Sequence, residues 1–501
     1  MCMKRICRLW LLALCASVLV ACSERGDSTE TPPAKPTTPS QLWMPVFLSD
    51  GMVVQQNSVA TYWGKTNAGA EVWAEATWLE EKTTTTADAE GRWRLDIPTP
   101  AASKKAYRVV IRDSHHGAKA INDVLIGEVW HFAGQSNMEM PMRGFGSVAG
   151  GNYQPVANAD NEIAATINMP YFRYFKVGYQ ASATPMEDVR DNKWWRASLS
   201  DQAKEFSAIA FFCGRRLAAE LDVPVGIICT PYGGTRIEAW LPTECFAVFS
   251  PSDYKEASEL DESAAKKSAP ALLYNGMVHP IEPYTVRGWA WYQGESNIDN
   301  AHAYARLQQS MVDAWRKAKG DFVAQLPFYY LQISGFSTKT DDSRAKMVEA
   351  QWNALSLIPN SDIVTTSDVG DQKLIHYPNK KVPGERLANL MLYKTYGQQQ
   401  INPYGPKVES VRYEGSKAMI RLSNAKGLKT TEQPIPHMQL AGSNGVFYSA
   451  TATILSDGVI EVTAPQVAVP KAVRYCFTSW HRSTLFNDAG VPLAPFRTDS
   501  Y

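Results

Sequence analysis

The central part of the chain alternates between short apolar runs and longer stretches of helical period, and this alternation constrains the fold most. The apolar runs are residues 129–133, 225–228, 288–292, 328–333 and 363–366. Stretches of helical period lie between them at residues 206–221 and 302–319. Strands that alternate with helices form a parallel sheet with helices on both of its faces. The sequence therefore predicts a doubly wound α/β domain over residues 123–403.

Shorter strand patterns, separated by turns, flank this central domain on both sides. Residues 59–63 and 107–111 precede it, and residues 408–413 and 459–462 follow it. Short strands at such spacing are typical of antiparallel β structure. We therefore expect an N-terminal β domain over residues 42–122 and a C-terminal β region over residues 404–501. A chain of 501 residues is also longer than one hydrophobic core usually serves.

The N-terminus has the features of an export signal. Lys4, Arg5 and Arg8 precede an apolar run that is short for a membrane span, so residues 1–22 are expected to be a signal peptide. The sequence LVAC, ending at Cys22, resembles a bacterial lipobox, in which that cysteine is lipidated; an ordinary secretory peptide is the alternative. Residues 23–41, rich in Pro, Thr and Ser, are expected to form a disordered tether. The protein is thus expected to be exported and lipid-anchored at the cell envelope, on the outer membrane, facing the periplasm or the surface.

Charge and cysteine content limit the classes of ligand that the protein is expected to bind. Lys plus Arg equals Asp plus Glu, 50 against 50, so no net field favours nucleic acid, and contact with a membrane is expected only through the lipid anchor. No CxxC pair occurs, and no metal site is predicted. No feature of the sequence points to a particular oligomeric state.

Three polar motifs follow three of the apolar runs. GQSNM at residues 134–138 places Ser136 directly after a predicted strand, where a serine hydroxyl is exposed beside helix N–H groups that can bind an oxyanion. A helix N-cap is the alternative for this serine. YGGT at residues 232–235 and QGESN at residues 293–297 follow two further strands. Because the carboxyl ends of parallel strands meet at one edge of a sheet, the three motifs predict one catalytic site.

A nucleophilic serine needs a base, and the chain has only eight histidines. Most of them lie in the β regions, within a strand or at a helix start, and His279 lies in a loop that is a candidate to line the pocket. His376 lies in a loop after the last predicted strand, together with Asp368 and Asp371. The chain order Ser, Asp, His is that of α/β hydrolases. His376 is therefore the preferred base.

Five sequence blocks carry a family resemblance. They are GEVWHFAGQSNMEM, FSAIAFFCGRRLAAEL with DVPVGIICTPYGGTRIEAW, LLYNGMVHP, GWAWYQGESN and DVGDQKLIHYPNKKVPGERLA. Together they resemble bacterial sialate O-acetylesterases and related carbohydrate acetylesterases of the SGNH hydrolase superfamily, in order from about residue 42 to residue 497. The resemblance implies a flavodoxin-like three-layer α/β/α fold, with a doubly wound parallel sheet flanked by antiparallel β regions. It also implies a serine carboxylesterase that needs neither metal nor organic cofactor.

The resemblance assigns roles to single residues. Ser136 corresponds to the nucleophile, and its own N–H group contributes to the oxyanion hole. Gly234 corresponds to a second oxyanion donor. The third block usually supplies a side-chain donor, for which Gln293 is preferred over Asn297. His376 corresponds to the base.

The carboxylate that orients the base is less clearly marked. Many members of the superfamily have an aspartate three residues before the histidine, but Lys373 occupies that position here. Asp371, Asp368 and Glu295 are the alternatives, and Asp371 is preferred because it is closer to His376. A dyad of serine and histidine is a further alternative.

The substrate expected from the resemblance is an acetylated mono- or oligosaccharide, most of all a sialic acid. Arg236, which follows the GGT segment, is a candidate to pair with a sialate carboxylate; a surface salt bridge is its alternative role. Acetyl-xylan and other plant glycans are alternative substrates. A catalytically inactive, glycan-binding surface lipoprotein and, more weakly, a peptidase are alternative functions.

Overall fold

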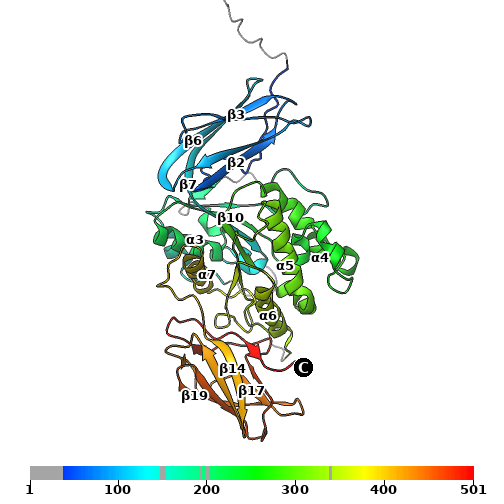
Figure 1. Ribbon diagram of the computed structural model, residues 1–501, viewed down its shortest axis with the longest axis vertical. Helices are drawn as coiled ribbons and strands as arrows, with labels where there is room; N and C mark the ends of the chain where they lie inside the picture. The colour runs from blue at the N-terminus through cyan, green and yellow to red at the C-terminus, as the bar shows by residue number, and fades with distance from the viewer. Residues whose placement is uncertain (1–37, 147–153, 191–194, 198–201, 338–340, 501) are drawn as a thin grey trace, which may run out of the picture.

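The computed structural model describes residues 38–146, 154–190, 195–197, 202–337 and 341–500. An N-terminal β region, a central α/β region and a C-terminal β region follow one another along the long axis (Figure 1). The expected signal peptide, Cys22 and residues 23–37 of the expected tether lie outside the described residues. Within the described ranges, none of the helices is long and apolar enough to cross a membrane.

The central sheet has the strand order β13-β12-β11-β7-β10-β8-β9. Its strands are β7 (Ala118–Gly134), β8 (Phe172–Lys176), β9 (Arg196–Ala197), β10 (Val225–Pro231), β11 (Gly288–Tyr292), β12 (Phe328–Leu331) and β13 (Ser361–Val364). All neighbours pair in parallel except the edge strand β9. The order of β10, β7, β11, β12 and β13 is that of a flavodoxin-like sheet, and β8 extends it beyond β10. The chain order reverses at β7, where such sheets place their ligands, so the predicted fold class is confirmed.

Strand β7 joins the N-terminal region to the central sheet. Its first part pairs with β6 (Ser103–Asp113) and β1 (Val53–Gln55), and its last part pairs with β10 and β11. Residues 118–123 are mostly exposed, whereas residues 124–134 are buried throughout, as expected for a strand that enters a sheet covered on both faces. The domain boundary expected between residues 122 and 123 falls inside this continuous strand.

Helices cover both faces of the central sheet. α3 (Ala208–Leu221) and α7 (Lys381–Lys394) lie on one side, and α5 (Ala301–Ala318) and α6 (Ser343–Asn353) lie on the other (Figure 1). Alternate residues of β7 point to opposite faces: Trp130 and Phe132 belong to one buried apolar cluster, and Val129 and Ala133 belong to the other.

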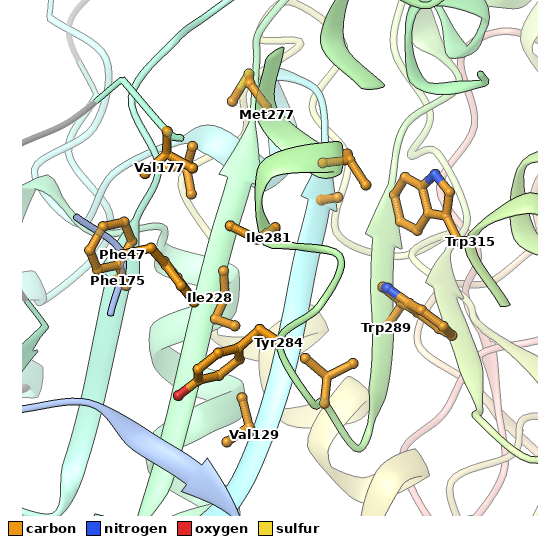
Figure 2. Packing of buried hydrophobic residues seen from close by; sticks show 14 of the residues in the cluster. Phe47, Val129, Phe175, Val177, Ile228, Met277, Ile281, Tyr284, Trp289 and Trp315 are labelled. Atoms are coloured by element: carbon orange, nitrogen blue, oxygen red, sulfur yellow. The ribbon is translucent and has the colours of Figure 1, made fainter. Parts of the chain in front are cut away.

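The N-terminal segment also contributes to the core of the central region. Phe47 packs edge-on against Phe175 of β8 and Tyr284, with ring centroids 4.9 and 4.8 Å apart, and Figure 2 shows this cluster beside Val129 and Ile228. Tyr284 also donates a hydrogen bond to the backbone oxygen of Val53. The N-terminal region is therefore anchored to the sheet by side chains as well as by β7.

The outer β regions are antiparallel. In the N-terminal region β2 (Ser58–Lys65) pairs with β5 (Arg92–Thr99), and β3 (Glu71–Ala76) pairs with β4 (Thr83–Thr86) and β6. The C-terminal region contains a sheet of β14 (Lys407–Glu414), β15 (Lys417–Ser423), β20 (Val459–Thr463) and β19 (Thr451–Ser456). A second sheet contains β18 (Phe447–Ser449), β17 (Met438–Ala441), β21 (Ala472–Tyr475) and β23 (Phe496–Arg497), and β16 (Lys429–Thr430) pairs with β22 (Leu485–Phe486). These C-terminal strands enclose an apolar cluster of their own.

Candidate active site

The three polar motifs meet at the carboxyl ends of the adjacent strands β10, β7 and β11. Backbone hydrogen bonds join the motifs directly: the Tyr232 N–H donates to the Gly134 oxygen (2.9 Å), and the Gln135 N–H donates to the Tyr292 oxygen (3.0 Å). The side-chain oxygen of Gln135 accepts a hydrogen bond from the Ser296 N–H (3.2 Å). The loops that follow these strands therefore form one connected surface at the point where the strand order reverses.

Ser136 is the first residue of the short helix α1 (Ser136–Glu139). It is 9% exposed, and within the described residues neither its hydroxyl nor its N–H group makes a hydrogen bond. Gly233 lies against it, since a β-carbon on Gly233 would be 3.3 Å from Ser136 Cβ and 2.8 Å from Glu139 Oε2. A side chain at position 233 would therefore have to displace the Glu139 carboxylate and press on Ser136.

The two glycines of the β10 loop have different roles. The Gly233 N–H donates to Glu139 Oε2 (2.5 Å) and is therefore occupied. The Gly234 N–H has no acceptor among the described residues, and Gly234 is exposed with a φ of 67°. The unoccupied N–H groups of Ser136 and Gly234 are thus the donors available to an oxyanion at this edge.

His376 is brought to the same edge by its two neighbours. The Ile375 oxygen accepts a hydrogen bond from Asn137 Nδ2 (3.3 Å), and the hydroxyls of Tyr377 and Tyr292 are 2.9 Å apart. The imidazole packs edge-on against Phe145, with ring centroids 4.9 Å apart. Burial, assisted by the nearby charge of Lys380, lowers the pKa of His376 from 6.5 to about 4. The imidazole is therefore neutral at pH 7, which is the state that a general base requires.

None of the three candidate carboxylates makes a hydrogen bond with His376 in the described part of the chain. Asp371 accepts from the N–H groups of Lys373 (2.8 Å) and Leu374 (2.9 Å), so it stabilises its own loop. Asp368 forms a bidentate ion pair with Arg386, in which Nη1 donates to Oδ1 (2.7 Å) and Nη2 donates to Oδ2 (2.8 Å). Asp371 and Asp368 therefore have partners other than His376 in the described residues, and the identity of a third triad member stays a prediction.

The third candidate, Glu295, lies in a buried network that includes Asn137, the residue after Ser136. Its Oε1 accepts from Asn137 Nδ2 (2.6 Å), while its buried Oε2 has no partner among the described residues. On the other side of Asn137, Lys380 donates to Oδ1 (2.6 Å). Asn137 thereby connects the motif of β7, the motif of β11 and the loop that carries His376.

Lys380 is a buried charge that was not expected from the sequence. It is fully buried, and its Nζ lies 3.5 Å from the centre of the Tyr377 ring. Burial lowers the pKa of Lys380 to about 7, although the charge of Glu295 opposes this effect. A lysine followed by a second lysine is typical of a solvated surface, so the sequence contains no signal of this buried cation.

The preferred side-chain oxyanion donor, Gln293, is committed to the fold instead. Its Nε2 donates to the Thr235 oxygen (3.0 Å) and to Asn297 Oδ1 (2.8 Å), and its Oε1 accepts from the Tyr304 hydroxyl (2.8 Å). The alternative, Asn297, donates to Glu238 Oε2 (2.8 Å) and is fully buried. Both amides therefore hold the β10 and β11 loops together. Gln293 Nε2 has two acceptors, and Asn297, which donates to Glu238, is fully buried.

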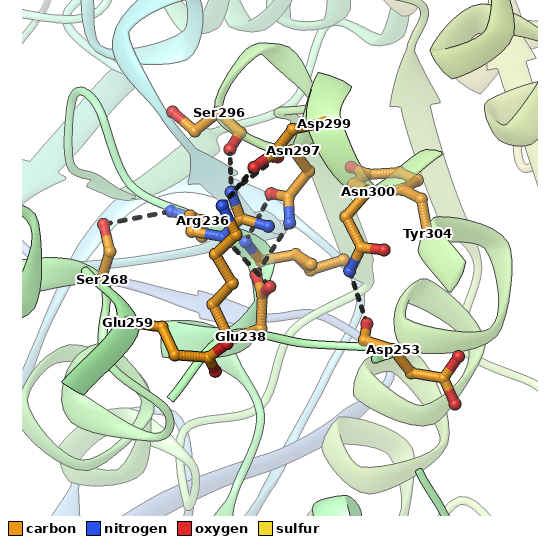
Figure 3. A network of polar contacts seen from close by, with 12 residues as sticks. Arg236, Glu238, Asp253, Glu259, Ser268, Ser296, Asn297, Asp299, Asn300 and Tyr304 are labelled. Carbon is orange, nitrogen blue, oxygen red and sulfur yellow. Dashed lines mark hydrogen bonds and ion pairs between the residues drawn. The ribbon is translucent and has the colours of Figure 1, made fainter. Parts of the chain in front are cut away.

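Arg236 also has a structural role, which corrects its assignment as a substrate-binding residue. Its side chain is 8% exposed and forms ion pairs with Glu238 (3.1 Å) and Asp299 (2.8 Å), as Figure 3 shows. It donates a further hydrogen bond to the Ser296 oxygen (2.8 Å). The alternative role, a salt bridge, is the one observed, and its pair with Glu238 is buried, whereas Asp299 is exposed.

No cluster of possible metal ligands accompanies these residues. Within the described ranges, no group of three or more His, Cys, Asp or Glu side chains is arranged to hold a metal ion. Cys213, Cys229 and Cys476 are buried and free, and Cys245 is free and partly exposed. The polar groups of the site are therefore those of the three strand-end loops and the His376 loop.

The central region is a three-layer α/β/α domain with a flavodoxin-like sheet, and the loops that carry Ser136 and His376 are joined by the hydrogen bond from Asn137 to the Ile375 oxygen. A family model described as carbohydrate esterase, sialic acid-specific acetylesterase, matches residues 126–393. The chain belongs to this family and is a carboxylic ester hydrolase that acts on acetylated carbohydrate.

Individual relatives agree with this assignment. The sialate O-acetylesterase of Homo sapiens is 25% identical over 410 residues, which cover 75% of each chain. The sialate O-acetylesterase of Mus musculus is 22% identical over 500 residues, covering 87% of this chain and 89% of its own. The crystal structure of a carbohydrate acetylesterase from Xanthomonas citri superposes with a TM-score of 0.80 and 29% identity, covering 92% of this chain and 100% of that chain. The likeness to that structure therefore includes the outer β regions.

Proposed function

We propose that this enzyme removes O-acetyl groups from sugars through an acetyl-serine intermediate on Ser136, with His376 as the base. One observation carries the proposal: Ser136 lies where three strand ends meet, and among the described residues its hydroxyl, its N–H group and the Gly234 N–H of the neighbouring loop have no hydrogen-bond partner. The loop of His376 is tied to the residue next to Ser136 by the hydrogen bond from Asn137.

The reaction follows from these groups in two steps. Ser136 Oγ attacks the acetyl carbonyl carbon while neutral His376 takes its proton, and the oxyanion accepts hydrogen bonds from the Ser136 and Gly234 N–H groups. The imidazolium of His376 then returns the proton to the sugar oxygen as the C–O bond breaks. His376 then deprotonates water, which attacks the carbonyl carbon of the acetyl-serine. As the bond between this carbon and Ser136 Oγ breaks, His376 returns the proton to Oγ and acetate is released. Each oxyanion donor contributes about 3 kcal/mol to stabilisation of the transition state.

Sialic acid is the sugar that we propose, because the family description and the relatives in mammals both refer to it. Acetyl-xylan and other plant glycans are the competing substrates. Acetate release should be measured on matched amounts of 9-O-acetyl sialate, acetyl-xylan and acetylated pectin. Preferential release from the plant polymers would replace sialate in the proposal without affecting the serine mechanism.

The serine mechanism is tested by Ser136→Ala, with Ser296→Ala as a matched control at the same sheet edge. Wild type and Ser296→Ala should hydrolyse p-nitrophenyl acetate and be labelled by a serine-reactive phosphonate. Ser136→Ala should lose about 10⁴-fold or more in kcat and the label. Near-native activity of Ser136→Ala would overturn the mechanism. A wild type that binds acetylated sugar but takes up no label would instead be the inactive, glycan-binding lipoprotein.

We also propose that a lipid on Cys22 anchors the enzyme at the cell envelope, from the lipobox-like sequence LVAC alone. Wild type should incorporate radioactive palmitate and fractionate with membranes, whereas Cys22→Ala should do neither. Cys2→Ala provides the control for another cysteine of the same segment. Equal labelling of wild type and Cys22→Ala would contradict the proposed anchor.

A further inference from the structure

Two tyrosine rings and a lysine form a small surface beside the nucleophile, which we call the rim cluster: Tyr179, Tyr232 and Lys267. The rings of Tyr179 and Tyr232 stack with their centroids 4.5 Å apart and their planes 20° apart. Tyr179 is 41% exposed, and Tyr232 and Lys267 are partly exposed. The cluster is therefore open to a ligand, unlike the buried network around Arg236.

The rim cluster is fixed to the turn that carries Ser136. The Tyr179 hydroxyl donates to Glu139 Oε1, and Glu139 Oε2 accepts from the Gly233 N–H (2.5 Å). Glu139 is the last residue of α1, one helical turn after Ser136. The tyrosine pair is thus held on the same short helix and glycine loop as the nucleophile and the oxyanion donor.

Lys267 lies directly beside that glycine loop. Its Nζ donates to the Gly233 oxygen (3.0 Å) and lies 5.7 Å from the centre of the Tyr232 ring. A β-carbon on Gly234 would be 2.9 Å from this Nζ, so the ammonium is adjacent to the residue that offers the free N–H. Lys267 lies near the end of α4 (Glu262–Ser268), and its side chain reaches the loop that follows β10.

The charge of Lys267 is not neutralised by the described residues. No described carboxylate lies within ion-pair distance of its Nζ, because nearby Glu139 is directed to Gly233 and Tyr179. An ammonium group has three N–H donors, and the Gly233 oxygen accepts only one of them. By contrast, the preceding Lys266 is paired with Glu262 on the outside of α4 (2.6 Å).

We propose that Lys267 binds the carboxylate of an acidic acetylated sugar, while Tyr179 and Tyr232 contact the sugar itself, so that the enzyme prefers sugar acids to neutral sugars. This inference rests on the proposed function, because it places the acid group beside the oxyanion site of Ser136. The two ammonium donors of Lys267 that have no acceptor among the described residues can bind a carboxylate through charge-assisted hydrogen bonds. In this proposal Lys267, rather than Arg236, is the cation that pairs with the carboxylate of the sugar.

The experiment compares an O-acetylated sialic acid with the same sugar whose carboxylate is capped as the uncharged carboxamide. Wild type should favour the acid by about tenfold in kcat/KM, mainly through KM. Lys267→Gln can still donate to the Gly233 oxygen but has no charge, so it should bring the ratio close to one. Lys267→Arg should restore most of the preference, and the control Lys266→Gln should behave as wild type.

The outcomes separate the two proposals. If Lys267→Gln keeps the wild-type preference for the acid, or if wild type has no preference, the role of Lys267 is refuted while the esterase mechanism stands. If wild type releases acetate from neither sugar and takes up no phosphonate, the proposed function itself has failed. Circular dichroism of each variant shows whether a lost preference is accompanied by a lost fold, and restoration by Lys267→Arg excludes that cause independently.

Discussion

Replacing Lys380 by methionine should change the acid side of the pH profile of this esterase. Lys380 is fully buried, donates to Asn137 Oδ1 (2.6 Å) and lies 3.5 Å from the centre of the Tyr377 ring. Its positive charge disfavours protonation of His376. Methionine retains an unbranched apolar chain of similar length without the charge, so it removes the electrostatic effect with little change in packing.

The size of the effect is bounded by the two causes of the low His376 pKa. Burial and Lys380 together lower the pKa from 6.5 to about 4, and burial is the larger cause. Loss of the smaller cause should therefore raise the pKa by no more than about one pH unit. His376 acts as a base only when neutral, so activity is lost as pH falls through its pKa. The acid limb of kcat/KM should lie near pH 4 in wild type and move upward in Lys380→Met.

The assay is kcat/KM for p-nitrophenyl acetate from acid to neutral pH, because this substrate is uncharged and the limb then reports an enzyme group. Lys381→Met is the matched control, since Lys381 lies on the surface and pairs with Glu162 (2.7 Å). Its acid limb should coincide with that of wild type. An acid limb in Lys380→Met that stays in place, or moves to lower pH, would refute the proposed coupling between Lys380 and His376. Circular dichroism at each pH separates titration from acid unfolding.

Three further changes test other parts of the site. Gly233→Ala places a β-carbon 3.3 Å from Ser136 Cβ and should lower kcat on p-nitrophenyl acetate about 100-fold, with an unchanged circular dichroism spectrum; near-normal kcat would show that Ser136 tolerates displacement. Arg236→Met leaves Glu238 buried without its cation and should lower the free energy of unfolding in urea by about 3 kcal/mol; an unchanged midpoint would contradict the buried ion pair. Asp371→Asn keeps an oxygen for its own loop, so kcat/KM should stay within about threefold of wild type, whereas a loss near 10⁴-fold would make Asp371 the partner of His376.

The fold was predictable where the sequence pattern is local. The apolar run expected at residues 288–292 coincides with β11 (Gly288–Tyr292), and the helical period at residues 302–319 nearly coincides with α5 (Ala301–Ala318). α7 (Lys381–Lys394) was not predicted, because Pro383 and Gly384 near its start are weak helix formers. A β-carbon on Gly384 would lie 2.8 Å from Phe212 Cβ, so this glycine permits α7 to pack closely on α3. The helix therefore depends on tertiary packing that no local pattern reveals.

The residues of the candidate site were likewise predictable only where the sequence signal is local. Ser136 follows from a motif and a strand end, which are both local features, and the glycine loop follows in the same way. Gln293, Arg236 and Asp371 are polar residues at the expected edge, but whether such a residue faces substrate depends on which neighbours already satisfy its hydrogen bonds. For Gln293 and Arg236 these neighbours, Thr235 and Asp299, come from other loops, so the sequence cannot show that these donors are occupied. Asp371 instead accepts from N–H groups of its own loop.

The occupied side chains explain why backbone groups remain to do the chemistry. Gln293 and Arg236 join the β10 and β11 loops through buried hydrogen bonds and ion pairs, and such contacts hold nearby backbone N–H groups in place without solvent rearrangement. In the proposed mechanism the two lysines near Ser136 have different roles. Lys380 is buried and paired with Asn137, so its charge acts on the base, whereas Lys267 is partly exposed and without a described carboxylate partner, so its charge is available to the substrate. An acidic sugar bound at Lys267 would therefore leave the cation that acts on His376 in place, which separates recognition of the sugar from control of the base.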